Sequence, residues 1–214
     1  MKITKHAHAC VELDSDGCNL LIDPGTFTPN AAGLIARASA VLITHDHADH
    51  VDTPVLEAAL GSRTDLSVWG PAPVTERWTG QYPDRVHTVR HGDTFTANGL
   101  NVAVHGHKHA GIHPDIPQVA NVGYLVEGAV YHPGDAYHVP DAAVSTLLVP
   151  TSGPWTKLGE AVDYIRAVNP DTIIQIHEVM LSAAGLHSTA TLLSPSMLSK
   201  TALIQLPAGE SMDL

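Results

Sequence analysis

The point where an apolar strand runs into a cluster of histidines restricts this chain more than any other feature. The segment "SAVLIT" predicts a buried strand over residues 40–44, and "HDHADH" follows it directly, with three histidines and two aspartates in six residues. Polar groups are costly to bury unless they are paired or bind an ion. A buried strand that ends in so many imidazoles and carboxylates therefore predicts a polar cavity at the end of a sheet.

The spacing of this cluster indicates which side chains share the cavity. His45 and His47 are two residues apart, so in extended chain they project to the same side. Asp49 and His50 follow where the chain turns into a helix predicted over residues 52–60, and they can reach the cavity from another direction. Two adjacent sets of imidazole and carboxylate ligands suit a pair of divalent cations. The alternative is a hydrogen-bonded structural cluster, which the pattern favours far less.

Composition supports a well-buried globular protein and argues against a nucleic-acid partner. Of the 214 residues, 44% are hydrophobic and only 15% are charged, which predicts a single domain over residues 1–214. Eleven basic residues against 22 acidic ones leave a net charge of -11, with no basic stripe for a phosphate backbone. Histidine is the exception: there are 15, in several separate clusters, which favours metal binding or proton transfer over a tag.

Cysteine use and hydropathy predict a cytoplasmic protein. Cys10 and Cys18 are the two cysteines, both in strand-like segments and neither in a Cys-x-x-Cys motif, so we expect buried free thiols in a reducing compartment. The N-terminal segment "MKITKHAHACVEL" has no apolar core of signal-peptide length. No run approaches the roughly 18 apolar residues that a membrane helix needs. We therefore expect no membrane partner.

Short strands alternate with helices along both halves of the chain. We predict strands over residues 9–13, 18–22, 40–44, 66–70, 86–89, 94–97, 100–104, 144–150, 172–177 and 202–206, and a hairpin over 122–135. Helices are predicted near residues 31–37, 52–60, 72–79, 157–169 and 189–198. Strand runs with interspersed helices in both halves suggest two sheets packed together with helices outside.

The motif His45-x-His47-x-Asp49-His50 after an apolar strand resembles the signature of the metallo-β-lactamase superfamily of metal-dependent hydrolases. The resemblance extends over nearly the whole chain. "HACVEL" and "LLIDPG" resemble the opening strands of the family, "HPGD" its later Gly-Asp motif, and "IQIHE" its last strand-end histidine. The likeness is greatest to the compact branch that includes ascorbate-6-phosphate lactonase-like hydrolases. It implies an α/β fold, a four-layer αββα sandwich of two mixed sheets, with the site at one edge between the sheets.

The resemblance also implies two sets of metal ligands. His45, His47 and a later histidine would hold one ion, Asp49, His50 and His177 would hold a second, and Asp135 would bridge the two. The later histidine is open, because "VHGHKHAGIHPD" offers His107, His109 and His113. We choose His109, which lies just past the predicted strand 100–104. Ligand sets of nitrogen and oxygen accept several divalent ions, and we expect zinc first, with manganese or iron as alternatives.

Further residues are expected to support this centre or contact the substrate. Asp23 is predicted to accept a ring N–H of a metal-bound histidine, although "DPG" is also an ordinary turn. His8 lies near the same edge, either as a similar supporting residue or as a satisfied core histidine. Loops beside the site supply four candidates for substrate contact, each weighed evenly against a structural role. They are His113, His138, Trp155 and Lys157.

Together these features predict a dinuclear metal-dependent hydrolase. A hydroxide bridging the two ions would attack a small ester, lactone or phosphoester, and Asp49 would accept a proton as the catalytic residue. A nuclease or phosphodiesterase acting on nucleic acid and a non-catalytic metal-binding protein are the alternatives. The diiron redox branch of the superfamily has Glu where this chain has His47, and it adds a flavin domain. We expect a small-molecule substrate as partner and leave a homo-oligomer open.

Overall fold

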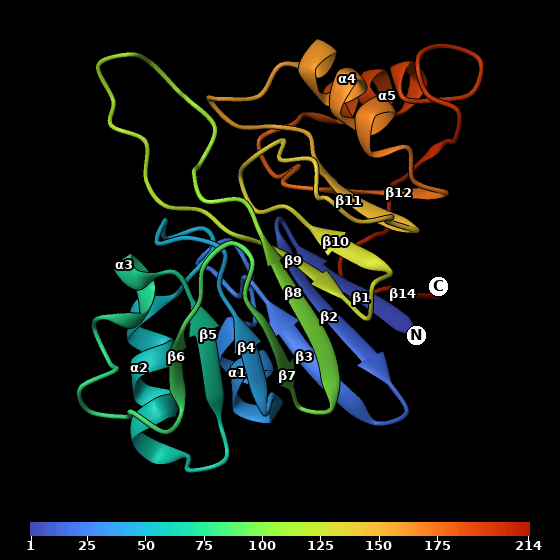
Figure 1. Ribbon diagram of the computed structural model, residues 1–214. Helices are drawn as coiled ribbons and strands as arrows, with labels where there is room; N and C mark the ends of the chain where they lie inside the picture. Colours follow the sequence, from blue (N-terminus) through green and yellow to red (C-terminus); the bar gives the residue numbers. More distant parts are fainter.

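Two mixed sheets of seven strands each pack face to face, with helices on their outer faces (Figure 1). The structure is a computed structural model and describes residues 1–214. A cluster of 20 buried residues from both sheets fills the space between them. Two smaller apolar clusters lie between each sheet and its helices. The predicted four-layer αββα sandwich is therefore confirmed.

Both sheets follow the same plan, in which antiparallel strands on one side continue into parallel strands on the other. The first has the order β14-β1-β2-β3-β4-β5-β6 and the second β13-β12-β11-β10-β9-β8-β7. Pairing is antiparallel from β14 to β3 and from β7 to β10, and parallel elsewhere. The first sheet comprises β1 (Lys2–Ala7), β2 (Cys10–Ser15), β3 (Cys18–Ile22), β4 (Ala40–Leu42), β5 (Ser67–Gly70), β6 (Val86–Thr88) and β14 (Ser211–Asp213). The second comprises β7 (Thr94–Ala97), β8 (Leu100–His105), β9 (Gly123–Val126), β10 (Val130–His132), β11 (Thr146–Pro150), β12 (Thr172–Ile176) and β13 (Leu203–Ile204).

Five helices complete the fold: α1 (Ala31–Arg37), α2 (Thr53–Ser62), α3 (Ala72–Thr75), α4 (Leu158–Val168) and α5 (Ala183–Leu192). Residues of α1, α2 and α3 pack on the first sheet, and those of α4 on the second. The N-cap of α2 is Asp52, whose carboxylate accepts the Val55 N–H at 3.3 Å, so the helix begins directly after the histidine cluster. None of the five helices has the length and apolar character to cross a membrane.

A buried tyrosine connects the two sheets beside the end of β4. Tyr124 on β9 is fully buried, and its hydroxyl donates to the Ile43 carbonyl at 2.7 Å. Val122, just before β9, donates its backbone N–H to the Thr44 carbonyl at 2.9 Å. These bonds hold the chain immediately before the histidine cluster against the second sheet, so the strand ends of both sheets meet at one edge.

The structure differs from the sequence prediction in one helix and in one pair of strands. The helix expected near 189–198 is α5, which begins after Ser182, whose hydroxyl accepts the Gly185 N–H at 3.2 Å. Pro195 lies inside the expected range and cannot continue a helix, since it lacks a backbone donor. The pair β1 and β14 was not predicted, because β14 is a polar edge strand that takes its hydrogen bonds from β1.

Candidate metal centre

The candidate ligands, together with the supporting residue Asp23, gather where parallel strands of both sheets end. Asp23 follows β3 directly, His45 lies just past β4, Asp135 follows β10, and His177 follows β12. Loops at the carboxyl ends of parallel strands are the usual place for binding sites in open α/β sheets. The packing of the two sheets therefore brings segments far apart in the sequence to a single edge.

One group of donor atoms is formed by His45, His47, His109 and Asp135, whose ligand atoms all lie within 4.8 Å of one another. The His45 Nε2 and His47 Nδ1 atoms are 3.1 Å apart, and the His109 Nε2 atom is 3.4 Å from the Asp135 Oδ2 atom. His45 and His109 are buried, whereas His47 is partly exposed. These three imidazoles and one carboxylate are therefore close enough together to share one cation.

A second group, again within 4.8 Å, consists of His8, Asp49, His50 and His177. The Asp49 Oδ2 atom lies 3.1 Å from His8 Nε2 and 3.4 Å from His177 Nε2. His8 is the member that sequence reasoning placed only in a supporting role. It lies in the turn between β1 and β2, with a φ of 52°, and no local motif marks it as a ligand.

Asp135 belongs to the first group and also contacts two histidines of the second. Its Oδ1 atom is 3.1 Å from His50 Nε2, and its Oδ2 atom is 3.1 Å from His177 Nε2 as well as close to His109. Trp155 donates its indole N–H to Oδ2 at 2.9 Å, and Asn121 Oδ1 accepts the backbone N–H of Asp135 at 3.0 Å. The carboxylate is therefore fixed in a position from which its two oxygens can serve two ions.

The outer nitrogens of three rings are held by protein acceptors. His50 Nδ1 lies 2.6 Å from Asp23 Oδ2, His109 Nδ1 2.6 Å from its neighbouring carbonyl of Ala110, and His177 Nδ1 2.6 Å from the Ser152 carbonyl. A ring whose Nδ1–H donates outward presents the lone pair of Nε2 to the cavity. These contacts orient the rings for metal binding.

Asp23 has no direct contact with the cavity and acts on the loop behind it. Its Oδ1 atom accepts the Thr44 N–H at 2.8 Å and its Oδ2 atom accepts the Thr44 hydroxyl at 2.6 Å, in addition to the bond from His50. The residue is fully buried and has a φ of 51°. This left-handed backbone costs about 1–2 kcal/mol in a residue other than glycine, and it turns the carboxylate toward Thr44 and His50.

Several buried polar atoms of the two groups lie close together without a well-aligned hydrogen bond. They are His50 Nε2, His109 Nε2, His177 Nε2 and Asp135 Oδ1, and the three nitrogens lie 3.1–3.4 Å from an oxygen of Asp135. Each such atom costs about 1–3 kcal/mol if nothing satisfies it. All are lone-pair donors of the kinds that zinc and related divalent ions bind. The residues present therefore fit divalent metal ions in both groups.

The close contacts between carboxylates and imidazoles shift the pKa values of the groups that line the site. Burial raises the pKa of Asp135, but His50 and the hydrogen bonds from His109 and His177 outweigh it and hold this pKa well below its usual value. Burial lowers the pKa of His177, but Asp135 and Asp49 outweigh it and raise this pKa to about 9. In the metal-free protein, a positive charge on His177 is thus stabilised by the two carboxylates.

The four residues predicted to contact the substrate differ in how exposed they are and in what they contact. Trp155 is buried and contacts Asp135 as described, and His138 is half-buried among other histidines. His113 has a side chain 60% exposed and lies 3.5 Å from Asp115, while the 78% exposed Lys157 pairs with Glu160 at 3.0 Å. Neither His107 nor His113 belongs to either group of ligands, so the geometry favours His109 as the third histidine.

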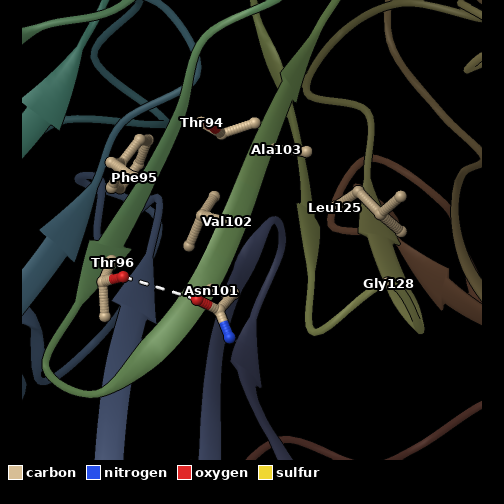
Figure 2. A pocket seen from close by; sticks show the side chains of 8 residues that line it. All are labelled: Thr94, Phe95, Thr96, Asn101, Val102, Ala103, Leu125 and Gly128. Carbon is tan, nitrogen blue, oxygen red and sulfur yellow. Dashed lines mark hydrogen bonds between the residues drawn. The ribbon is translucent and has the colours of Figure 1, made fainter.

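A separate hollow of about 330 Å³ lies on the outer strands of the second sheet. Figure 2 shows that its lining comes from β7, β8, β9 and the turn after β9, with a hydrogen bond of 3.4 Å between the Thr96 hydroxyl and Asn101. It contains no histidine and no carboxylate. The hollow therefore offers no hydrolytic chemistry, and the strand-end centre is the candidate site.

The fold and this centre define a metal-dependent hydrolase of the metallo-β-lactamase superfamily. The chain belongs to this superfamily: the model of the Beta-lactamase superfamily domain matches residues 2–177. Protein Rv0786c of Mycobacterium tuberculosis is 37% identical over 85% of this chain and 86% of that protein. A UPF0173 metal-dependent hydrolase of Methanopyrus kandleri is 31% identical over 83% of this chain and 84% of that protein. A probable L-ascorbate-6-phosphate lactonase of Salmonella newport is 31% identical, over 56% of this chain and 38% of that protein.

Solved structures share the fold at low sequence identity. A metallo hydrolase from Ignicoccus hospitalis superposes with a TM-score of 0.74 at 18% identity, covering 99% of this chain and 97% of that one. The metallo-beta-lactamase fold protein YhfI of Bacillus subtilis has a TM-score of 0.71 at 16% identity, covering 99% and 98%. At these identities the likeness concerns the fold alone.

Proposed function

We propose that this protein is a dinuclear hydrolase that cleaves a small ester, lactone or phosphoester. The observation that carries the proposal is the position of Asp135, whose two carboxylate oxygens contact histidines of both ligand groups. A carboxylate can bridge two cations, whereas a neutral imidazole offers one lone pair. His45, His47 and His109 would hold one ion, and Asp49, His50 and His177, with His8 beside them, would hold the other.

Divalent ions bound there would lower the pKa of a water molecule and polarise the oxygen of a substrate carbonyl or phosphoryl group. Asp49 is placed to handle the proton. Its Oδ2 atom makes the contacts to His8 and His177, which leaves Oδ1 to accept a proton from the attacking water. Its side chain is 19% exposed, so a substrate entering from solvent can reach it. Asp49 is therefore the proposed catalytic residue.

Substrate recognition is proposed for the loop that follows His109. A hollow of about 440 Å³ lies in this loop and is lined by residues from Gly111 to Gln118, including His113. This loop extends away from the two sheets in Figure 1, in the green part of the chain. His113 could contact an anionic group of the substrate. Lys157, at the start of α4, is a weaker candidate because Glu160 already neutralises it.

A small-molecule substrate agrees with the charge of the chain. The net charge of -11 disfavours a nucleic-acid substrate. The lactonase likeness lends support to a lactone, although it covers only part of that relative. Cys10 and Cys18 form no disulfide, in keeping with the proposed cytoplasmic location. Six histidines with two carboxylates make zinc the first ion to test, followed by manganese and iron.

Metal analysis combined with a substrate panel tests the proposal. We expect close to two tightly held equivalents of metal per chain after dialysis, and hydrolysis of at least one ester, lactone or phosphoester by that form. His177→Gln should lose metal and activity together, while His187→Gln on the exposed face of α5 should change neither. A wild-type protein that keeps less than one equivalent after metal is added back would contradict the proposal.

A further inference from the structure

A third group of histidines lies outside the proposed centre, at the base of two loops that lead to it. His91 precedes β7, His105 is the last residue of β8, and His138 comes three residues after Asp135. Their ligand atoms lie within 4.8 Å of one another. The ring of His91 is 6.1 Å from that of His105 and 5.7 Å from that of His138, between centroids. Three elements far apart in the sequence thus place three imidazoles together.

The rings of this group lack the partners that buried histidines normally have. Both ring nitrogens of His105 and the Nε2 atom of His138 are buried without a hydrogen bond. Burial, then the neighbouring imidazoles, lowers the pKa of both residues, so both are neutral at pH 7 and offer lone pairs. The negative charge of Asp141 partly offsets this effect by raising the pKa of His105 and His138. His107 acts in the opposite direction and lowers the pKa of His138.

The local backbone is built to keep these rings close. Gly106 follows His105 with a φ of +78°, and a Cβ atom there would lie 3.2 Å from the His138 ring. Its backbone N–H donates to His91 Nδ1 at 3.0 Å. A neutral His91 therefore carries its proton on Nε2, and it must give up this bond, or turn its ring, before it can bind an ion.

We propose that His91, His105 and His138 form an accessory site for a divalent transition-metal ion, separate from the dinuclear centre. Three imidazoles suit Zn²⁺, Ni²⁺ and Cu²⁺. Nitrogens in a tetrahedral zinc site are roughly 3.3 Å apart, from bonds of 2.0–2.1 Å, so donor atoms that lie within 4.8 Å of one another need to move inward by at most about one ångström. Side-chain rotation provides this, and a water molecule can complete the coordination.

An ion at this site would connect the two loops that carry ligands of the centre. His105 leads through Gly106 to His109, and His138 follows Asp135 closely in the chain. Binding would therefore brace both loops and raise the melting temperature of a protein whose dinuclear centre is already filled, because a ligand that binds only the folded state stabilises it. The accessory ion should also be the one that exchanges most readily.

Native mass spectrometry of the zinc-loaded protein tests this proposal. The probe is Zn²⁺ alone, added at micromolar concentrations to protein that has been dialysed to its tightly bound content. We expect one further ion per wild-type chain, accompanied by a rise in melting temperature. His105→Gln and His138→Gln should abolish the extra ion, and His91→Gln should weaken its binding. His187→Gln, again on exposed α5, should bind it like the wild type.

The outcomes separate this site from the dinuclear centre. A further ion that persists in both His105→Gln and His138→Gln would be a surface ion, and the proposal would be overturned. It would also be overturned if the wild type bound no ion beyond its tightly held content. His91 is exposed, so His91→Gln will fold even if a buried substitution does not. Because ions are counted beyond the tightly held content, the result does not depend on hydrolytic activity.

Discussion

The two histidine-rich regions of this protein are built from the same side chain but have different surroundings. In the strand-end centre, the outer nitrogens of His50, His109 and His177 donate to Asp23 and to two backbone carbonyls. In the group of His91, His105 and His138, the one hydrogen bond to a ring comes from a backbone N–H, which occupies a lone pair of His91. One region has its rings oriented in advance, and the other must rearrange to bind.

We expect the groups behind a cluster of imidazoles to decide how tightly the cluster binds a metal ion. Outer partners fix the tautomer and the ring orientation, and their loss typically lowers metal affinity 10- to 100-fold. Carboxylates add to this effect, since Asp49 and Asp135 lie among the histidines of the strand-end centre. The accessory group has only Asp141 nearby. We therefore expect tight and weak binding in the same chain.

The largest effect is expected from Asp135→Asn, which removes the charge shared by the two ligand groups at nearly constant volume. We predict loss of at least one of the two tightly held ions and a fall in kcat/KM of about 10³-fold or more, equivalent to about 4 kcal/mol. Metal analysis and steady-state kinetics measure both. Binding of the accessory ion should be unchanged. Full retention of two ions by this variant would show that Asp135 does not bridge them.

Asp23→Asn should have the next largest effect, because Asp23 accepts the ring N–H of His50. We predict a 10- to 100-fold loss of metal affinity at the strand-end centre, measured by competition with a chelator. Asp16→Asn in the exposed turn between β2 and β3 is the matched control, since Asp16 also has a positive φ. Equal metal affinities in the two variants would show that Asp23 does not support metal binding at the centre.

Proton release on metal binding should distinguish the two regions. Burial lowers the pKa of His177, but Asp135 and Asp49 raise it to about 9, so His177 is protonated at pH 7 in the metal-free protein. A metal ion must displace this proton, and its affinity should rise with pH up to about 9. Calorimetry in buffers of different ionisation enthalpy measures the release. It should be smaller in His177→Gln, and it should also be smaller for binding at the accessory site, where burial lowers the pKa of His105 and His138.

The raised pKa of His177 also determines whether the metal-free protein gains or loses stability as the pH rises. A folded pKa of about 9 lies above the unfolded value of about 6.5. The stabilising contribution of His177 is therefore fully present below pH 6.5 and is lost as the pH rises through 9. Urea unfolding of the metal-free protein between these pH values should show falling stability. An increase over this range would contradict the proposed contacts with Asp135 and Asp49.

Trp155→Phe should have the smallest effect, because it removes only the indole N–H that holds Asp135 Oδ2 while keeping an aromatic ring in the loop. A hydrogen bond to a charged group contributes about 1.5–3 kcal/mol. We predict a fall in kcat/KM of about tenfold with both tightly held ions retained. Trp78→Phe, buried against the other sheet, is the control. Loss of metal in Trp155→Phe would contradict this prediction and would show that the indole is needed for metal binding as well as for positioning Asp135.

Local patterns in the sequence were sufficient to place the main elements of the centre. The strand before His45 and the helix after it fix where the His45–His50 segment lies, because a two-residue spacing in extended chain sets the side on which side chains project. Asp135 and His177 were predicted at strand ends, and the structure places them there. The helix near 189–198 failed because the prediction ignored Pro195.

Other features depend on contacts that no local pattern contains. His8 joins Asp49, and Asp23 joins His50, only because β1, β2, β3 and β4 lie in this order in one sheet. His109 is distinguished from His107 by the path of the loop between β8 and β9, which brings only His109 into a ligand group.

The sequence by itself thus determined which residue types stand at the strand ends and which fold class they belong to. Only the tertiary structure decided which imidazoles lie close enough to share an ion, which acceptor lies behind each ring, and that His91, His105 and His138 meet at all. The physical reason is that hydrophobic burial and strand spacing are encoded locally. The distance between two side chains on different sheets is set by how the whole core packs.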